Sequence, residues 1–320
     1  MMETVYITQE NCVLHRSEDH LILRQQGKCV GTIPLLNVKC IVLISSVQIT
    51  SQATDMLLEK QIDVIYTSRS GHIKGCLQSQ SGNGAVIRIA QHHTFASREL
   101  RLDIAKSIVA GKIANQQHLL ETYQRYYSLT EYKALVQKMK EYASKLPQAQ
   151  SIDELMGIEG ISARVYWDGF RCLLKQPAFT RREYRPAPDY VNSALNLAYA
   201  FLNSELTICL AAQRFDLEIG FLHSIHYGRN SLPLDLMEEF RSPFADAWLL
   251  GLFNKNMLKE SHFYGKERGY YLNSEGFAKF IALYHEHLEE GNWKPKFRTQ
   301  AQSLKKAVMT GEPYEPYRCA

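Results

Sequence analysis

Cys29-Val30-Gly31-Thr32-Ile33 and Ile41-Val42-Leu43 are short runs rich in β-branched residues, and runs of this kind dominate the start of the chain. Such runs, separated by polar or glycine-containing turns, are typical of β-strands. One helix, from about Thr54 to Lys60, interrupts the series of strands. The glycines and serines of residues 71–84, which follow the last strand, indicate a flexible exit from the β-rich region. The other runs of this type are Val5-Tyr6-Ile7, Cys12-Val13-Leu14, Leu21-Ile22-Leu23 and Ile62-Asp63-Val64-Ile65-Tyr66.

The pattern changes after about residue 86, where apolar residues recur at helical spacing. Ser151 with Glu154 forms a capping box, which predicts a helix start at that point. The sequence therefore predicts an α+β fold, with a small N-terminal β domain over residues 1–85 and a larger all-helical domain over residues 86–320. The expected helical segments are 92–126, 130–146, 152–173, 190–212, 234–253, 274–289 and 297–309.

Composition points to a soluble globular protein, because 45% of the 320 residues are hydrophobic and 22% are charged. The formal net charge of +4 is too small to demonstrate nucleic-acid binding by itself. The 7 cysteines are scattered without a CxxC pair, which argues against a zinc site or a disulfide framework. No signal peptide and no apolar stretch of roughly 20 residues is evident, so we expect a cytoplasmic protein that does not contact a membrane.

Three places hold acidic or imidazole groups in unusual settings. Glu159 lies between Gly157 and Gly160, which leave room for a ligand to approach its carboxylate. The alternative is a solvent-exposed glutamate in a kinked helix. His223 ends an apolar segment and opens a loop, a position that suits metal ligation or proton transfer. A structural histidine bonded to a backbone carbonyl is equally compatible with the sequence.

The third place is an acidic cluster, in which Asp235 shares a helix face with Glu238 and Glu239. Negative charge near a helix N-terminus would explain the cluster without any function. The functional interpretation is a carboxylate site for a hard cation, and together with Glu159 and His223 it would suit Mg²⁺ or Mn²⁺ at a phosphodiester-cleaving centre.

A basic segment with interleaved aromatic residues follows Glu159. Its cations could neutralise phosphates, and aromatic rings could stack on exposed bases. A solvated helix face backed by core aromatics is the alternative. The candidate DNA-binding residues are Arg164, Arg181, Arg182 and Arg185.

These same residues resemble the Cas1 family, the CRISPR-associated integrases of spacer acquisition. The resemblance extends over essentially the whole chain and depends on several pieces in the same order. They are residues 112–116 (KIANQ), 156–164 (MGIEGISAR), 185–196 (RPAPDYVNSALN), 220–223 (GFLH) and 234–243 (LDLMEEFRSP).

The resemblance implies a helical catalytic domain with one metal site per subunit, in which Glu159, His223 and Glu238 are the ligands. Asp235 matches a second acidic position of the motif, and the family often has aspartate where this chain has Glu238. The resemblance also implies a homodimer, with two dimers bridged by the small Cas2 protein.

The implied activity is attack by a DNA 3′-hydroxyl on a phosphodiester at the border of a CRISPR repeat, with Mg²⁺ or Mn²⁺ as cofactor. The substrates would be double-stranded and branched DNA, since hydrolysis and strand transfer differ only in the attacking group. Two alternatives remain at this point: a catalytically silent DNA-binding scaffold, and a branched-DNA repair nuclease with no CRISPR role.

Overall fold

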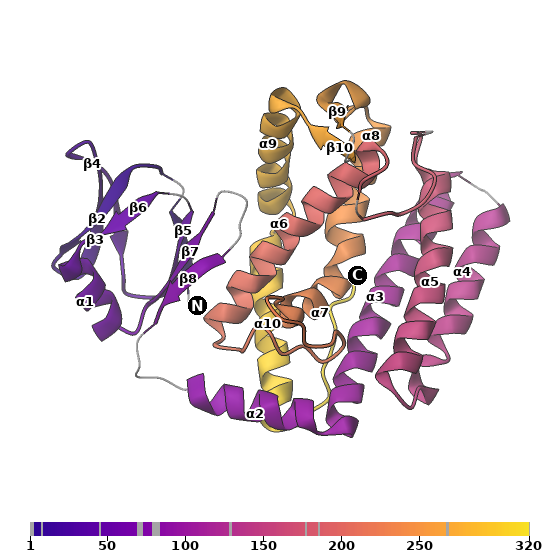
Figure 1. The fold of residues 1–320 in the computed structure, drawn as a ribbon, viewed down its shortest axis with the longest axis horizontal. Helices are drawn as coiled ribbons and strands as arrows, with labels where there is room; N and C mark the ends of the chain where they lie inside the picture. Colours follow the sequence, from indigo (N-terminus) through magenta and orange to yellow (C-terminus); the bar gives the residue numbers. More distant parts are fainter. Residues whose placement is uncertain are drawn as a thin grey trace. The chain divides into compact units, whose positions relative to one another are not determined.

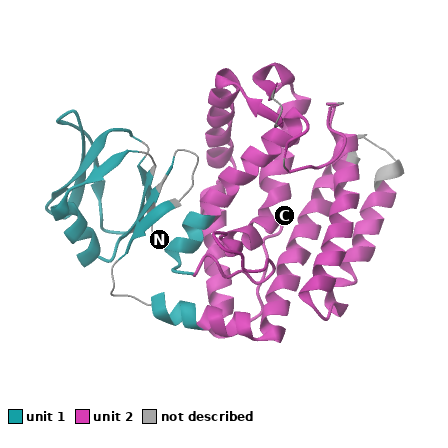
Figure 2. Cartoon of the chain, in the orientation of Figure 1, with its two compact units in different colours: residues 1–89, 207–215 teal, residues 90–206, 216–320 magenta. Residues whose placement is uncertain are grey.

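The computed structural model describes residues 3–7, 9–44, 46–68, 73–78, 84–127, 130–176, 178–184, 186–266 and 269–319. The chain forms two compact units (Figure 2). The first contains residues 1–89 together with 207–215, and the second contains residues 90–206 and 216–320. The fold is α+β, with a β-rich N-terminal region followed by a mostly helical region.

The first unit is built from two four-stranded sheets and one helix, α1 (Ser51–Glu59). In one sheet the strand order is β1-β5-β7-β8, and in the other it is β4-β3-β2-β6. The strands are β1 (Glu3–Ile7), β2 (Cys12–Ser17), β3 (His20–Gln25), β4 (Lys28–Pro34), β5 (Val38–Ile44), β6 (Val47–Ile49), β7 (Asp63–Thr67) and β8 (Ile73–Leu77).

Burial explains why these runs are strands. β5 pairs in parallel with both β1 and β7, and its residues 40–43 are almost completely buried. A central parallel strand covered on both faces reads as a continuous apolar run. β2 instead alternates, with Cys12 and Leu14 buried and Val13 and His15 half-buried, as expected for a strand with one face on the core.

The second unit is mostly helical (Figure 1). The helices α3, α4 and α5 lie side by side, and α3 also packs against α7. The helices of the chain after β8 are α2 (Gly84–Ala96), α3 (Arg98–Tyr127), α4 (Thr130–Ala143), α5 (Ile152–Leu173), α6 (Tyr190–Ala212), α7 (Ser231–Phe240), α8 (Ala247–Asn254), α9 (Ser274–Glu290) and α10 (Trp293–Thr310).

Local signals account for several helix ends. Ser151 caps α5, and its side-chain oxygen accepts a hydrogen bond from the Glu154 backbone N–H at 3.2 Å. This confirms the predicted start of that helix. Asn273 caps α9 in the same way, accepting from the Gly276 N–H at 2.8 Å.

The structure differs from the sequence prediction in five places, four in the arrangement of strands and helices and one within the expected helix over 234–253. Residues 73–77 form β8, so the expectation of a flexible exit there is wrong; Gly71 and Gly82 lie outside the described residues. β6 was not expected. The expected helix over 92–126 belongs to two helices, α2 and α3. The helical region also contains a hairpin of β9 (Phe263–Lys266) and β10 (Gly269–Leu272), so it is not all-helical.

The expected helix over 234–253 is interrupted by a π-helical segment, Arg241–Asp246, between α7 and α8. Pro243 lies within it and lacks the N–H that a regular helix needs, which favours a widened turn. The segment follows directly after the acidic cluster, and π-turns are frequent at functional sites.

Among the described residues, one helix, α6, is long and apolar enough to cross a membrane. However, 72% of its most apolar 18-residue window is buried inside the protein. This burial is typical of the core helix of a soluble protein.

Candidate functional site

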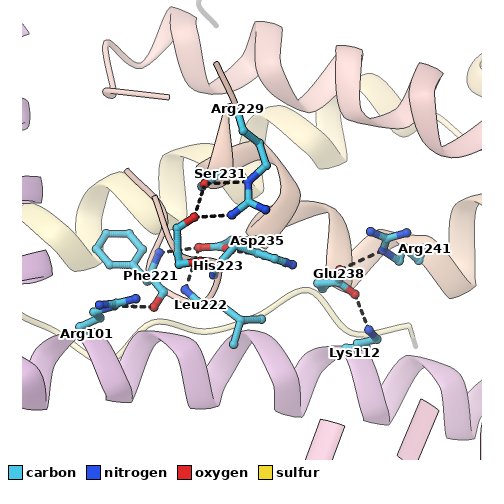
Figure 3. Close-up of polar contacts among 11 residues, drawn as sticks. Arg101, Lys112, Phe221, Leu222, His223, Arg229, Ser231, Asp235, Glu238 and Arg241 are labelled. Carbon is cyan, nitrogen blue, oxygen red and sulfur yellow. Dashed lines mark hydrogen bonds and ion pairs between the residues drawn. The ribbon is translucent and has the colours of Figure 1, made fainter. Parts of the chain in front are cut away.

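Three helices supply the charged residues at the centre of the site. Lys112 lies on α3, Glu159 on α5 and Glu238 on α7. The Lys112 ammonium donates a hydrogen bond to Glu159 Oε1 and lies 2.5 Å from Glu238 Oε2. The other Glu238 oxygen, Oε1, accepts from Arg241 Nε at 3.0 Å (Figure 3). The structure therefore brings Glu159 and Glu238 together around one lysine.

Burial strengthens these charge interactions. The exposed fraction is 11% for the Lys112 side chain, 18% for Glu159 and 6% for Glu238. Water screens such charges poorly, so each ion matters more here than at the surface.

Asp235 fixes the turn that carries His223. Its fully buried carboxylate accepts hydrogen bonds from the backbone N–H groups of Phe221, Leu222 and His223, at 2.5, 2.9 and 2.9 Å (Figure 3). A Cβ at Gly220 would lie 2.7 Å from Asp235 Oδ2, so this close approach of the turn requires glycine.

Asp235 also orients the imidazole, because its Oδ1 lies 2.6 Å from His223 Nδ1. When the ring is neutral and Nδ1–H donates to the carboxylate, Nε2 keeps its lone pair. Metal-ligating histidines usually have this arrangement. The contacts of Asp235 run to the His223 turn, whereas those of Glu238 run to Lys112 and Arg241, although both acids lie on α7.

The pKa values follow from these contacts. Burial alone would raise the pKa of Glu238, but the positive charges of Arg241, Lys112 and His223 outweigh it and lower that pKa to about 2. Burial lowers the pKa of Lys112, but Glu238 and Glu159 more than reverse this, so the pKa is raised. Both groups are therefore charged at neutral pH.

The pKa of His223 shows its coupling to the same site. Burial lowers this pKa, but the hydrogen bond and charge of Asp235, with the charge of Glu238, raise it above its usual value. His223 and Glu238 thus each affect the other's protonation.

A buried polar network lies behind Arg241. The Arg241 guanidinium lies over the Tyr199 ring, 4.5 Å from its centroid. The Tyr199 hydroxyl donates to Asp246 at 2.5 Å, and the Tyr166 hydroxyl donates to the same carboxylate at 2.7 Å. Burial raises the pKa of Asp246 to about 6. This network holds Arg241 against Glu238.

The residues present fit a hard divalent cation chemically. Glu238 Oε2 is buried, and its contact with Lys112 is an ion pair without ordinary hydrogen-bond geometry, so this oxygen could bind a metal. Within the described residues, no group of three or more His, Cys, Asp or Glu side chains already surrounds one metal position. The cation that contacts the two carboxylates there is the Lys112 ammonium.

The predicted basic residues occupy different environments. Arg164 is exposed on α5, and Arg181 is exposed beside Glu183 at 2.6 Å. Arg182 donates to Asn192 and Asn196 at 3.0 and 2.7 Å, so its guanidinium is bound internally. Arg185 lies outside the described residues. DNA contacts by these residues stay a prediction.

Lys112 and Arg241 lie in stretches that carry the family resemblance, but sequence reasoning assigned a site role to neither. Arg241 follows Glu238 by one helical turn, a spacing that could have indicated an ion pair. Lys112 gave no such signal, because its partners are 47 and 126 residues away along the chain. A lysine in a long helix ordinarily indicates a solvated face.

The chain has a β-rich N-terminal unit and a helical unit, and the helical unit carries a histidine and buried acids. These features define a class of protein, the two-part α+β proteins with an acidic site suited to a cation. The family described as "CRISPR associated protein Cas1" matches residues 5–286, and the chain belongs to this family.

The similar proteins agree with that assignment. A CRISPR-associated endonuclease Cas1 from Thermus thermophilus is 31% identical over 98% of this chain and 98% of its own length. A chain of a partial Cas6-RT-Cas1–Cas2 complex is 21% identical, with a TM-score of 0.81 and complete coverage of both chains. A casposase bound to its integration product is 19% identical, with a TM-score of 0.75 and coverage of 97% and 96%. These last two likenesses concern the fold.

Proposed function

We propose that this protein is a metal-dependent DNA integrase and endonuclease that inserts new spacers into CRISPR arrays. The observation that carries the proposal is the pair of largely buried acids, Glu159 and Glu238, that meet at Lys112, with a charge interaction between Glu238 and His223, whose Nδ1 is bound by Asp235. Membership of the Cas1 family supports the CRISPR role. The casposase, a protein of the same fold bound to an integration product, supports strand joining.

Glu159, Glu238 and His223 Nε2 would hold Mg²⁺ or Mn²⁺. When bound, the cation would polarise the scissile phosphate and favour the alkoxide form of an attacking 3′-hydroxyl. Oxygen and imidazole donors without thiolates suit these metals.

The chain's own residues prepare this site. Asp235 fixes the orientation of the imidazole and, when the ring is neutral, leaves its Nε2 lone pair for a metal. Arg241 holds Glu238 through Oε1. Asp235 and Arg241 thus orient two of the proposed ligands in advance, and such positioning supplies much of the rate acceleration in phosphoryl transfer.

The partners belong to the same proposal. We expect double-stranded and branched DNA as substrates, a homodimer, and a small Cas2 partner that bridges two dimers in the cytoplasm. The neighbour found in a Cas1–Cas2 complex supports the Cas2 partner.

The test is an integration assay with a 3′-hydroxyl oligonucleotide, a plasmid that carries CRISPR repeats, the Cas2 partner, and Mn²⁺ or Mg²⁺. Joining at repeat borders that stops with EDTA is the expected result. DNA binding without joining or cleavage would instead indicate a silent scaffold. Cleavage of branched DNA without joining at repeats would indicate a repair nuclease.

A further inference from the structure

Lys112 is placed as a shared counter-ion rather than as a surface lysine. Its ammonium contacts carboxylates from two other helices, Glu159 on α5 and Glu238 on α7. Only 11% of its side chain is exposed, and its carboxylate partners are also largely buried. Buried like charges repel strongly when no cation lies between them, so Lys112 stabilises the two acids in one place.

We infer that Lys112 is an internal counter-ion that occupies the place of the metal between Glu159 and Glu238 and leaves it when a divalent cation binds. This role rests on the proposed function, because it treats the two acids as metal ligands. It makes Lys112 a positioning residue that keeps the acids together in the metal-free protein and competes with the metal for them.

Geometry makes the two occupants mutually exclusive. A hard cation binds carboxylate oxygens at about 2.0 to 2.6 Å. The ammonium already lies 2.5 Å from Glu238 Oε2 and hydrogen-bonds Glu159 Oε1. A metal ion and an ammonium cannot share these positions, and their charges repel.

The contacts of Glu238 allow the exchange without loss of its orientation. Oε1 is bound by Arg241, while Oε2 is the atom that faces Lys112. When the ammonium leaves, Oε2 becomes free and Arg241 still holds the carboxylate. The flexible four-carbon stem of lysine permits such a movement at little cost.

The test is the affinity for Mn²⁺, measured by isothermal titration calorimetry on the full chain without DNA. The neutral variants Lys112→Met and Lys112→Gln should bind Mn²⁺ about tenfold more tightly than the wild type, because the metal no longer displaces an ammonium. Lys112→Arg keeps a cation at this position and should not show the gain. In metal-free buffer the neutral variants should melt at a lower temperature, and Mn²⁺ should raise their melting temperature more than that of the wild type.

The matched control is Lys106→Met, six positions earlier on the same helix, whose ammonium donates to the Pro147 carbonyl at 3.0 Å. It removes the same charge from the helix without touching the acids, so its Mn²⁺ affinity should equal that of the wild type. Equal or weaker binding by the neutral Lys112 variants, or an equal gain in Lys106→Met, would overturn the role of Lys112.

Two further outcomes are informative. If the neutral variants do not fold without metal, recovery of the folded state by Mn²⁺ but not by NaCl supports the inference, and no recovery overturns it. If neither the wild type nor any variant binds Mn²⁺, the proposed metal-dependent function fails as well. Binding by the wild type that is lost in His223→Ala, without a gain in the neutral variants, contradicts the role of Lys112 alone.

Discussion

At His223, the effect of a substitution on catalysis can be measured separately from its effect on DNA binding. We predict that His223→Ala abolishes strand transfer and leaves DNA affinity nearly unchanged, because phosphate contacts come mainly from arginine and lysine side chains elsewhere. Electrophoretic mobility shift and joining assays on the same preparation would measure both. His226 is exposed and lies three residues along the same loop, so His226→Ala is the control and should retain activity. Equal loss in both variants would remove His223 from the proposed ligand set.

His287 makes the stability of the fold depend on pH, and it does so outside the candidate site. Its Nε2 donates to the Phe244 carbonyl at 2.8 Å, and its ring stacks on Trp248 at 5.2 Å between centroids. Burial lowers the pKa of His287 to about 4. The folded pKa is thus below the unfolded value of about 6.5, so His287 stabilises the fold fully above that value and loses this contribution as the pH falls through 4.

The expected loss between pH 7.5 and pH 5 is about 1 to 2 kcal/mol, allowing for the partial exposure of the ring. Urea unfolding followed by tryptophan fluorescence would measure it, because Trp248 and Trp293 both contact His287. In His287→Gln, which cannot titrate, this part of the pH dependence should disappear. His93 is exposed, so the control variant His93→Gln should keep the pH dependence of the wild type. An unchanged pH dependence in His287→Gln would contradict this assignment.

At the scale of elements, the C-terminal segment 312–319 forms hydrogen bonds with both α3 and α7 and so links the two helices. Glu239 on α7 accepts from the Tyr314 hydroxyl and the Tyr317 N–H, each at 2.7 Å. Asn115 on α3 donates to the Tyr317 carbonyl at 2.9 Å. Glu239 has no expected ligand role, and the structure shows that it anchors this segment beside Glu238.

Gly111 on α3 allows the segment to pass closely, since a Cβ there would lie 2.6 Å from Pro316 Cβ. Gly111→Ala should therefore lower the free energy of unfolding by about 1 to 3 kcal/mol and reduce activity, although alanine favours a helix. Adding Pro316→Gly removes the clashing atom and should restore part of both. Gly157→Ala, which meets nothing within 4 Å, should not destabilise α5. If Gly111→Ala is as stable as the wild type, the segment 312–319 moves away from the added Cβ at little cost, and the prediction is wrong.

Local signals in the sequence predicted many elements correctly, because burial and capping act over a few residues. The alternation in β2 and the Ser151 cap of α5 are examples. The division between α2 and α3 was missed because the apolar spacing continues across it. Ser97, whose side chain accepts from the Leu100 N–H at 3.3 Å, is the feature that marks the second helix start.

The site could be predicted only in part for the opposite reason. The local settings of Glu159, His223 and Glu238 make each a candidate, but their shared role as ligands rests on the family resemblance, since spacing alone cannot show that distant segments meet. The role of Lys112 could not be predicted from the sequence. Its pairing with Glu159, 47 residues away, depends on how α3 packs against α5 and α7. Long-range packing leaves no periodic signal in the sequence.

At the scale of the whole molecule, the proposed DNA binding must come from local clusters, because the net charge is only +4. Neutralising the exposed Arg164 and Arg181 together should weaken DNA binding and flatten its salt dependence by about 0.9 in slope for each lost phosphate contact. Fluorescence anisotropy at several salt concentrations would measure this. Arg182→Gln should instead lower stability, since its guanidinium binds Asn192 and Asn196 internally. An unchanged slope in the double variant would assign both residues to a solvated face.

The proposed mechanism requires Glu159, His223 and Glu238 to hold one divalent cation where DNA strands are joined. Anomalous diffraction from crystals of the full chain grown with Mn²⁺ would locate that cation. One manganese peak is predicted at about 2.0 to 2.6 Å from a carboxylate oxygen of Glu159, one of Glu238, and His223 Nε2. A protein saturated with Mn²⁺ that shows no peak at these three side chains would contradict the account.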